Sequence, residues 1–238
     1  MTLKQRFGKL LFAHMPITRF LFDQLRVEIN VALMALGNAV LPSHRRRLRT
    51  IRSRCDWRVN VACGPHVLPG FLNLDLFPCQ ADVVGWDCRR ALPISDTSAI
   101  GIRAEHFIEH LEPREELPAF LKDCKRALRP GGILRIIVPD AERYLRAYCQ
   151  GDLDGFRELA VPDPFPEDLP TRMDVINHVF HQWHEHRWGY DYETLTHRLE
   201  QAGFKRYERM AYKKSSDSLL GQDLEHHAPY SLYVEAEN

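Results

Sequence analysis

The stretch Arg-Val-Asn-Val-Ala-Cys-Gly at residues 58–64 decides the fold that this sequence predicts. Its apolar run ends in a cysteine and a glycine, and a second turn follows at Pro69-Gly70. A short β-like run at 71–74 then stops at the acidic residue Asp75. Strand, glycine turn, strand and carboxylate in this order are typical of a nucleotide-type site in an open parallel sheet. The glycine lets the backbone approach a ligand closely, and the carboxylate can accept hydrogen bonds from a ribose diol.

Strand-like and helical patterns alternate along the rest of the chain, which predicts an α/β sheet. Only seven residues, 64–70, separate the first two expected strands, which is fewer than a parallel crossover with a helix needs. We therefore predict that this helix is missing or reduced to one turn, and that a helix from residues 20–54 fills that layer of the sheet. The expected strands are 58–63, 71–75, 81–86, 98–104, 133–138, 204–212 and 231–237, with a long polar loop at 213–230, and the expected helices are 113–128, 141–150 and 192–201.

Residues 1–57 predict a basic helical extension in front of a domain that takes residues 58–238. Apolar residues recur there every three to four positions, with breaks at Pro16 and Pro42, and Ser43 is the expected N-cap of a helix over 44–54. Residues 1–60 hold 12 Lys and Arg against 3 Asp and Glu, whereas the rest of the chain holds 20 against 29. A basic front on an acidic body favours an anionic partner, although a solvated helix face would give the same pattern.

Six arginines gather between Arg45 and Arg54. They suit an anionic membrane surface or a protein partner. Nucleic acid is less favoured, because no aromatic residues interleave with these arginines to stack bases. The segment 4–12 is amphipathic and basic as well, which also suits a membrane surface.

The composition favours a cytoplasmic protein that is peripheral at the membrane where its basic N-terminus docks. No run reaches the ~20 apolar residues that a bilayer span needs, and the N-terminus lacks a signal-peptide pattern. The six cysteines form no Cys-x-x-Cys pair. A reduced compartment therefore fits better than a disulfide framework or a zinc ribbon.

Four histidines stand at 178, 181, 184 and 186, close to Trp183, Trp188 and Tyr190. Their helical offsets of 3, 6 and 8 do not bring four ligands to one face, and no cysteine is near, so we expect no metal site. We interpret the segment as an aromatic and histidine wall that faces a substrate. Before it, the proline- and acid-rich residues 151–172 predict a mobile loop or lid, and after it Asp191 is expected to cap the next helix.

Taken in order, these motifs resemble a class I S-adenosylmethionine-dependent methyltransferase, and in particular the type-11 methyltransferase domain in its variant with a shortened first crossover. The resemblance covers residues 58–238 and implies a Rossmann-like sheet of seven strands with the last strand antiparallel. The runs that carry it are Val-Asn-Val-Ala-Cys-Gly at 59–64, Gly-Phe-Leu-Asn-Leu-Asp at 70–75, Val-Gly-Trp-Asp at 84–87, Leu-Pro-Ile-Ser-Asp-Thr-Ser at 92–98, His-Phe-Ile-Glu-His-Leu at 106–111, Leu-Arg-Pro-Gly-Gly-Ile-Leu-Arg-Ile-Ile-Val-Pro-Asp at 128–140 and Tyr-Asp-Tyr-Glu-Thr-Leu at 190–195.

The resemblance implies a cofactor, S-adenosyl-L-methionine, at the ends of the first four strands. Methyl transfer to oxygen or nitrogen also benefits from a base, and histidine suits neutral pH. The candidates for that role are His106, His110 and His186, for which a structural role is the alternative. Asn60, Ala62 and His66 depart from the family pattern, which more often has an acidic residue and glycines there. By position, the residues implied at the cofactor are Asn60, Ala62, Cys63, Gly64, Asp75, Leu76, Asp87, Cys88 and Glu105.

The acceptor that we expect is a small molecule, or a sugar or sugar-lipid hydroxyl, because members of this variant group often accompany polysaccharide assembly. Two alternatives stay open. One is RNA methylation, for which the Asn/Asp-Pro-Pro-aromatic signature of base N-methylation is absent. The other is a methyltransferase-like scaffold without turnover that docks a partner through its N-terminal helices. An NAD-dependent oxidoreductase is not favoured, because no Gly-x-x-Gly pattern follows Gly64.

Overall fold

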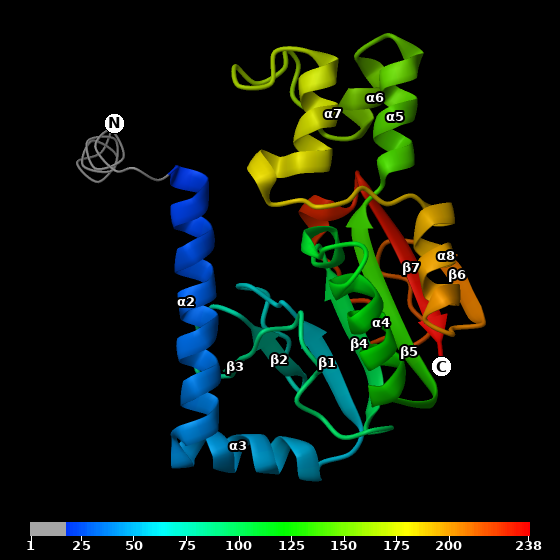
Figure 1. Cartoon of the computed structure of the whole chain (residues 1–238). Coiled ribbons are helices and arrows are strands. Elements are labelled where there is room, and N and C mark those ends of the chain that lie inside the picture. The colour runs from blue at the N-terminus through cyan, green and yellow to red at the C-terminus, as the bar shows by residue number, and fades with distance from the viewer. Residues whose placement is uncertain (1–17) are drawn as a thin grey trace. The chain divides into compact units, whose positions relative to one another are not determined.

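The computed structural model describes residues 18–238 (Figure 1), so the amphipathic segment at 4–12 lies outside the described residues. The chain divides into two compact units, the first ending at Arg49 and the second running from Thr50 to Asn238. No single described helix is long and apolar enough to cross a membrane. The helices Arg19–Val40 and Pro42–Ser53, which meet at a bend of 82°, satisfy that test of length and composition only as a pair.

Within residues 18–238, two helices precede the sheet. Helix α2 (Arg19–Val40) begins after Thr18, whose side chain accepts a hydrogen bond from the Leu21 N–H. Helix α3 (Pro42–Ser53) begins at Pro42, so the prediction of Ser43 as its N-cap is wrong. Proline suits the first helical position, because its missing N–H would have no partner there. The anionic partner of the 45–54 arginines and the cytoplasmic location stay predictions.

The second unit is built on one seven-stranded sheet, as predicted. The strand order is β3-β2-β1-β4-β5-β7-β6. Strand β7 is antiparallel to both of its neighbours, and all other pairs are parallel, which is the Rossmann-like α/β arrangement expected from the sequence. The strands are β1 (Trp57–Val61), β2 (Leu72–Asp75), β3 (Val83–Gly85), β4 (Ala99–Glu105), β5 (Leu128–Pro139), β6 (Arg206–Met210) and β7 (Ser231–Glu237).

The connection from β1 to β2 contains no helix within residues 62–71, which confirms the shortened crossover. The two strands are nevertheless parallel, with Val59 opposite Leu72. Tight turns make this possible, since Ala62 and Gly64 both have φ near +50°. Whether a helix from 20–54 fills the missing layer stays a prediction.

One face of the sheet is covered by helices α4 (Glu116–Ala127) and α8 (Tyr192–Gln201) (Figure 1). The buried stripe of α4 contains Leu117, Phe120, Leu121 and Cys124, as its spacing predicts. Asp191 is the N-cap of α8, and its side chain accepts a hydrogen bond of 2.7 Å from the Thr194 N–H. The predicted cap is therefore confirmed.

Loop residues from 211–224 cover part of the opposite face, and two buried arginines hold them there. Arg103 donates to the Gln222 carbonyl and to Glu105. Arg135 donates to both carboxylate oxygens of Asp223, at 3.0 and 2.6 Å, and to the carbonyls of residues 211 and 214. The predicted polar loop is therefore anchored by buried charge, which its composition did not indicate.

Three helices form a group near the carboxyl ends of β4 and β5 (Figure 1): α5 (Ala141–Gln150), α6 (Asp154–Glu158) and α7 (Arg172–His181). They share a small core in which Phe156 and Leu159 are buried. The prediction of a loop over all of 151–172 is therefore wrong for this part. Phe156 and Leu159 lie three residues apart, a spacing that puts both on one helical face.

Candidate functional site

Strands β1 to β4 have their carboxyl ends at one edge of the sheet. From β1 the chain continues to β2 on one side, and from β4 it continues to β5 on the other side. Val61 pairs with Leu74 on one side and with Ala104 on the other, so β1, β2 and β4 end level with one another. The strand order reverses between β1 and β4. In open α/β sheets, ligands bind in the crevice outside the carboxyl ends of the strands at such a reversal.

Gly64 and Asp75 form the part of this edge that suits a nucleoside. The Gly64 N–H donates to Asp75 Oδ2 at 2.8 Å, and the Phe77 N–H donates to Oδ1 at 2.7 Å. A carboxylate has about four lone-pair sites, so Asp75 keeps capacity for a diol. A Cβ placed on Gly64 would meet nothing within 4 Å, so the backbone borders open space there. These two residues fit the cofactor that the resemblance implies.

Asn60 points its side chain into the protein rather than into the crevice. Its amide nitrogen donates to Asn73 Oδ1 at 3.0 Å and to the His66 carbonyl at 2.8 Å, while its oxygen accepts from Arg103 at 3.2 Å. A carboxylate could not donate those two hydrogen bonds. The departure from an acidic residue at this position therefore has a structural reason.

The other residues predicted to bind the cofactor are buried or half-buried. Asp87 pairs with Arg89 through two hydrogen bonds of 2.9 and 3.0 Å. Burial, together with the charge of Asp75, raises the pKa of the Cys63 thiol to about 12, and burial raises the pKa of Cys88 as well. Neither thiol is a nucleophile at neutral pH. Ala62 and Leu76 are half-buried next to the turns after β1 and β2.

The Glu105 carboxylate, at the end of β4, accepts three hydrogen bonds. It accepts from the Leu224 N–H at 3.2 Å, from His227 Nδ1 at 3.0 Å and from Arg103. Burial alone would raise its pKa, but the hydrogen bond from His227 and the charge of Arg103 outweigh it and lower the pKa to about 2. Glu105 is therefore ionised, and it positions His227.

His106, His110 and His186 come together around one cavity of ≈ 380 Å³. His106 Nε2 lies 2.8 Å from Ser231 Oγ, and its ring stacks on His227 with centroids 3.8 Å apart. The structure thus gathers the three predicted catalytic histidines, although their roles stay predictions. The other lining residues are Pro139, Tyr144, His178, Val179, Gln182, His227 and Tyr230.

The three histidines are neutral at physiological pH because they are buried. Burial, with a further contribution from the charge of His227, lowers the pKa of His106 to about 3. Burial also lowers the pKa of His110, and it lowers that of His186 to about 4. Each ring therefore keeps one nitrogen lone pair that can accept a hydrogen bond.

Glu109 is a site residue that the sequence analysis missed. It is 1% exposed, and neither carboxylate oxygen has a hydrogen-bond partner among the described residues. His106 Nδ1 lies 3.4 Å from its Oε1. Burial raises the pKa of Glu109 to about 8. The sequence signal that could have pointed to Glu109 is its place between His106 and His110.

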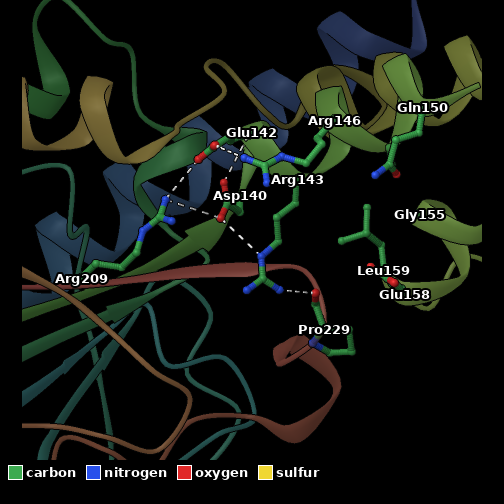
Figure 2. Close-up of a pocket in the computed structure, with 11 residues that line it drawn as sticks. Asp140, Glu142, Arg143, Arg146, Gln150, Gly155, Glu158, Leu159, Arg209 and Pro229 are labelled. Carbon is green, nitrogen blue, oxygen red and sulfur yellow. Dashed lines mark hydrogen bonds and ion pairs between the residues drawn. The ribbon is translucent and has the colours of Figure 1, made fainter.

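A second cavity, of ≈ 340 Å³, lies beside α5 and is lined by three arginines and three acids (Figure 2). Arg146 pairs with Glu142 at 2.6 Å, and Arg143 lies 3.5 Å from Asp140. Arg209 reaches both of these acids. The charges largely compensate one another, so this cavity has no net attraction for an anion.

No protein-family model and no curated protein sequence matches the chain. Solved structures that resemble it include a SAM-dependent methyltransferase from Archaeoglobus fulgidus, at 16% identity and a TM-score of 0.48 over 93% of this chain and 100% of that one. Another is a possible histamine N-methyltransferase from Thermotoga maritima, at 15% identity and 0.45 over 92% and 96%. A third is the N-methyltransferase NodS from Bradyrhizobium japonicum, at 12% identity and 0.42 over 88% and 98%. These scores are too low to support an inference, so the fold assignment rests on the strand order itself.

Proposed function

We propose that this protein is an S-adenosylmethionine-dependent methyltransferase that acts on a small polar acceptor. The observation that supports the proposal is that one edge of the sheet has both a turn suited to a nucleoside and a separate cavity. The Gly64–Asp75 turn suits a nucleoside. A separate cavity of ≈ 380 Å³ begins at His106, directly after β4. One edge thus offers a place for a methyl donor and a place for an acceptor.

The chain's own groups would hold the donor by its nucleoside. Asp75 would accept hydrogen bonds from the ribose hydroxyls, and the open backbone at Gly64 would admit the ribose and the methionine part attached to it through sulfur. When bound, the cofactor supplies an already activated methyl group. The protein therefore has mainly to position donor and acceptor.

The acceptor cavity supports a small polar substrate. Its volume lies in the range of small-molecule sites, and histidines and tyrosines form much of its lining. The neutral rings of His106, His110 and His186 can accept a hydrogen bond from an acceptor hydroxyl and orient its oxygen. A sugar or sugar-lipid hydroxyl fits this lining, and it is the acceptor that we propose.

Calorimetric titration with S-adenosylmethionine and S-adenosylhomocysteine tests the proposal. Micromolar binding of both is expected. Asp75→Asn should weaken binding by roughly tenfold or more, because a hydrogen bond to a charged group contributes ~1.5–3 kcal/mol. The matched control is Asp82→Asn, which changes an exposed carboxylate in the loop before β3 and should leave the affinity unchanged.

The outcomes separate the alternatives. If the wild type binds neither compound at millimolar concentration, the enzyme proposal fails and a non-catalytic scaffold is favoured. If both variants bind like the wild type, the cofactor does not contact Asp75. Circular dichroism of each variant shows whether a lost affinity reflects a lost fold.

A further inference from the structure

Three potential metal ligands from two distant segments lie close together, and two of them, His110 and His186, line the acceptor cavity. Glu109 and His110 lie in the turn after β4, and His186 follows α7. One ligand atom from each of them lies within 4.8 Å of the other two. Atoms bound at about 2.1 Å to a shared ion lie roughly 3–4 Å apart, so closure by about 1 Å would complete a site.

Backbone carbonyls fix the orientation of both histidines. His110 Nδ1 lies 3.1 Å from the Glu185 carbonyl oxygen, and His186 Nδ1 lies 2.6 Å from that of Val179. A carbonyl only accepts, so each Nδ1 must carry the proton and each Nε2 must carry the lone pair. Metal-bound histidines are held in the same way, with the second ring nitrogen donating to a carbonyl or carboxylate.

Glu109 is the acidic ligand of the three and would become negatively charged when a cation displaces its proton. Its side chain is 2% exposed, and both carboxyl oxygens lack a hydrogen-bond partner among residues 18–238. Buried polar groups are nearly always paired, so an orphaned carboxylate beside two oriented imidazoles points to a missing cation. The Glu109 carbonyl accepts from the N–H of Arg187 at 2.7 Å, and this bond holds the two segments together.

We propose that Glu109, His110 and His186 bind one divalent transition-metal ion. Two imidazoles and one carboxylate suit zinc and its first-row neighbours, whereas magnesium and calcium prefer oxygen ligands. Three protein ligands leave at least one coordination position open, which is the pattern of catalytic rather than structural zinc sites.

The open position would face the acceptor, because His110 and His186 both line the cavity. An ion there would take the Nε2 lone pairs of His110 and His186 in place of their hydrogen bonds to the acceptor. It would lower the pKa of a bound hydroxyl group, which neutral imidazoles alone do weakly. This role, unlike the metal site itself, rests on the proposed methyltransferase function.

Metal binding can be tested without any cofactor or acceptor. Tag-free protein is stripped with a chelator and titrated with Co²⁺, followed by its visible absorption, and with Zn²⁺ by calorimetry. One equivalent should bind. Removing one of the three ligands should weaken binding roughly 100-fold, because few ligands share the binding free energy.

The variants are Glu109→Gln, His186→Ala and the control pair His181→Ala/His184→Ala, which removes two exposed histidines of the same segment. The first two should lose binding and the control should keep it. Absence of a saturable site in the wild type overturns the proposal. So does unchanged binding in Glu109→Gln, which keeps the side-chain shape and serves as the test if His186→Ala does not fold. Titration with S-adenosylmethionine in parallel shows separately whether the proposed function holds.

Discussion

The buried arginine of β5 offers the sharpest test of how the candidate site is held in place. Arg135 is 0% exposed, and it bonds Asp223 twice and Glu235 once. Arg135→Met keeps most of the apolar stem and removes the charge. Each carboxylate then stays buried with one backbone N–H, from Lys213 at 2.7 Å and Ser216 at 2.9 Å, and Asp223 keeps only the more distant Arg103, at 4.0 Å, as a charged partner.

The expected loss of stability in Arg135→Met follows from the two carboxylates that stay buried. Removing one partner of a buried ion pair destabilises a protein by roughly 3–5 kcal/mol, because the remaining charge is uncompensated. For a domain of this size, 1 kcal/mol shifts the melting temperature by roughly 2–4 °C. The melting temperature of Arg135→Met should therefore fall by roughly 6–20 °C. The triple variant Arg135→Met/Asp223→Asn/Glu235→Gln should recover most of this loss, since no buried charge of the set remains.

Urea unfolding followed by tryptophan fluorescence gives the free energies of unfolding for the wild type, the single and the triple variant. A loss below about 1 kcal/mol in the single variant would refute the reasoning, because it would mean that water reaches these carboxylates. A triple variant no more stable than the single one would show that the hydrogen bonds to the carbonyls at 211 and 214, rather than the charges, hold the loop.

Two further substitutions test the cofactor edge. Glu105→Gln should remove a pH dependence: the pKa of Glu105 is lowered to about 2 in the folded protein. Since the unfolded pKa is ~4.3, its contribution of about 3 kcal/mol is fully present above about pH 5 and is lost as the pH falls toward 2. Urea midpoints measured from pH 7 to pH 3 should fall less steeply in the variant, and parallel curves would contradict this. Ala62→Gly should raise stability by up to about 1 kcal/mol, because Ala62 has φ +50°, and a left-handed conformation costs a residue with a Cβ ~1–2 kcal/mol against the ~0.5–1 kcal/mol entropic cost of glycine. A less stable Ala62→Gly protein would show that the methyl group packs against its neighbours.

The sheet was predictable because its signals are local. Residues 64–70 are too few for a crossover helix, and the chain indeed has none between β1 and β2. The apolar spacing of α4 and the cap at Asp191 depend on nearby residues only. Helix α6 was missed because its five residues lie in a segment rich in prolines and acids, whereas Phe156 packs in a core with residues of α5 and α7. The buried charges of Arg103 and Arg135 could not be inferred, since a strand that alternates apolar and charged residues ordinarily exposes the charged face.

The sequence indicated which residues belong to the candidate site, but not which of them contact one another. His106, His110 and His186 stood out because six of the twelve histidines lie in two short stretches, 106–110 and 178–186. The spacing of histidines within residues 178–186 carries no information on distant segments, so it could not reveal a site formed with Glu109 and His110. Glu109 itself looks like a surface acid in the sequence. Its burial depends on the tertiary contacts of the segment that carries His186.

One chain of buried contacts connects the donor side of the edge to the acceptor side. Arg103 donates to Asn60 on β1 and to Glu105 at the end of β4. Glu105 accepts from His227, and His227 stacks on His106 at the mouth of the acceptor cavity. Since each member of this chain is positioned by the next, the two halves of the candidate site cannot adjust independently. Under the proposed function, this dependence gives a physical reason for burying a costly charge in the sheet, because a methyl donor and its acceptor would have to be aligned for transfer.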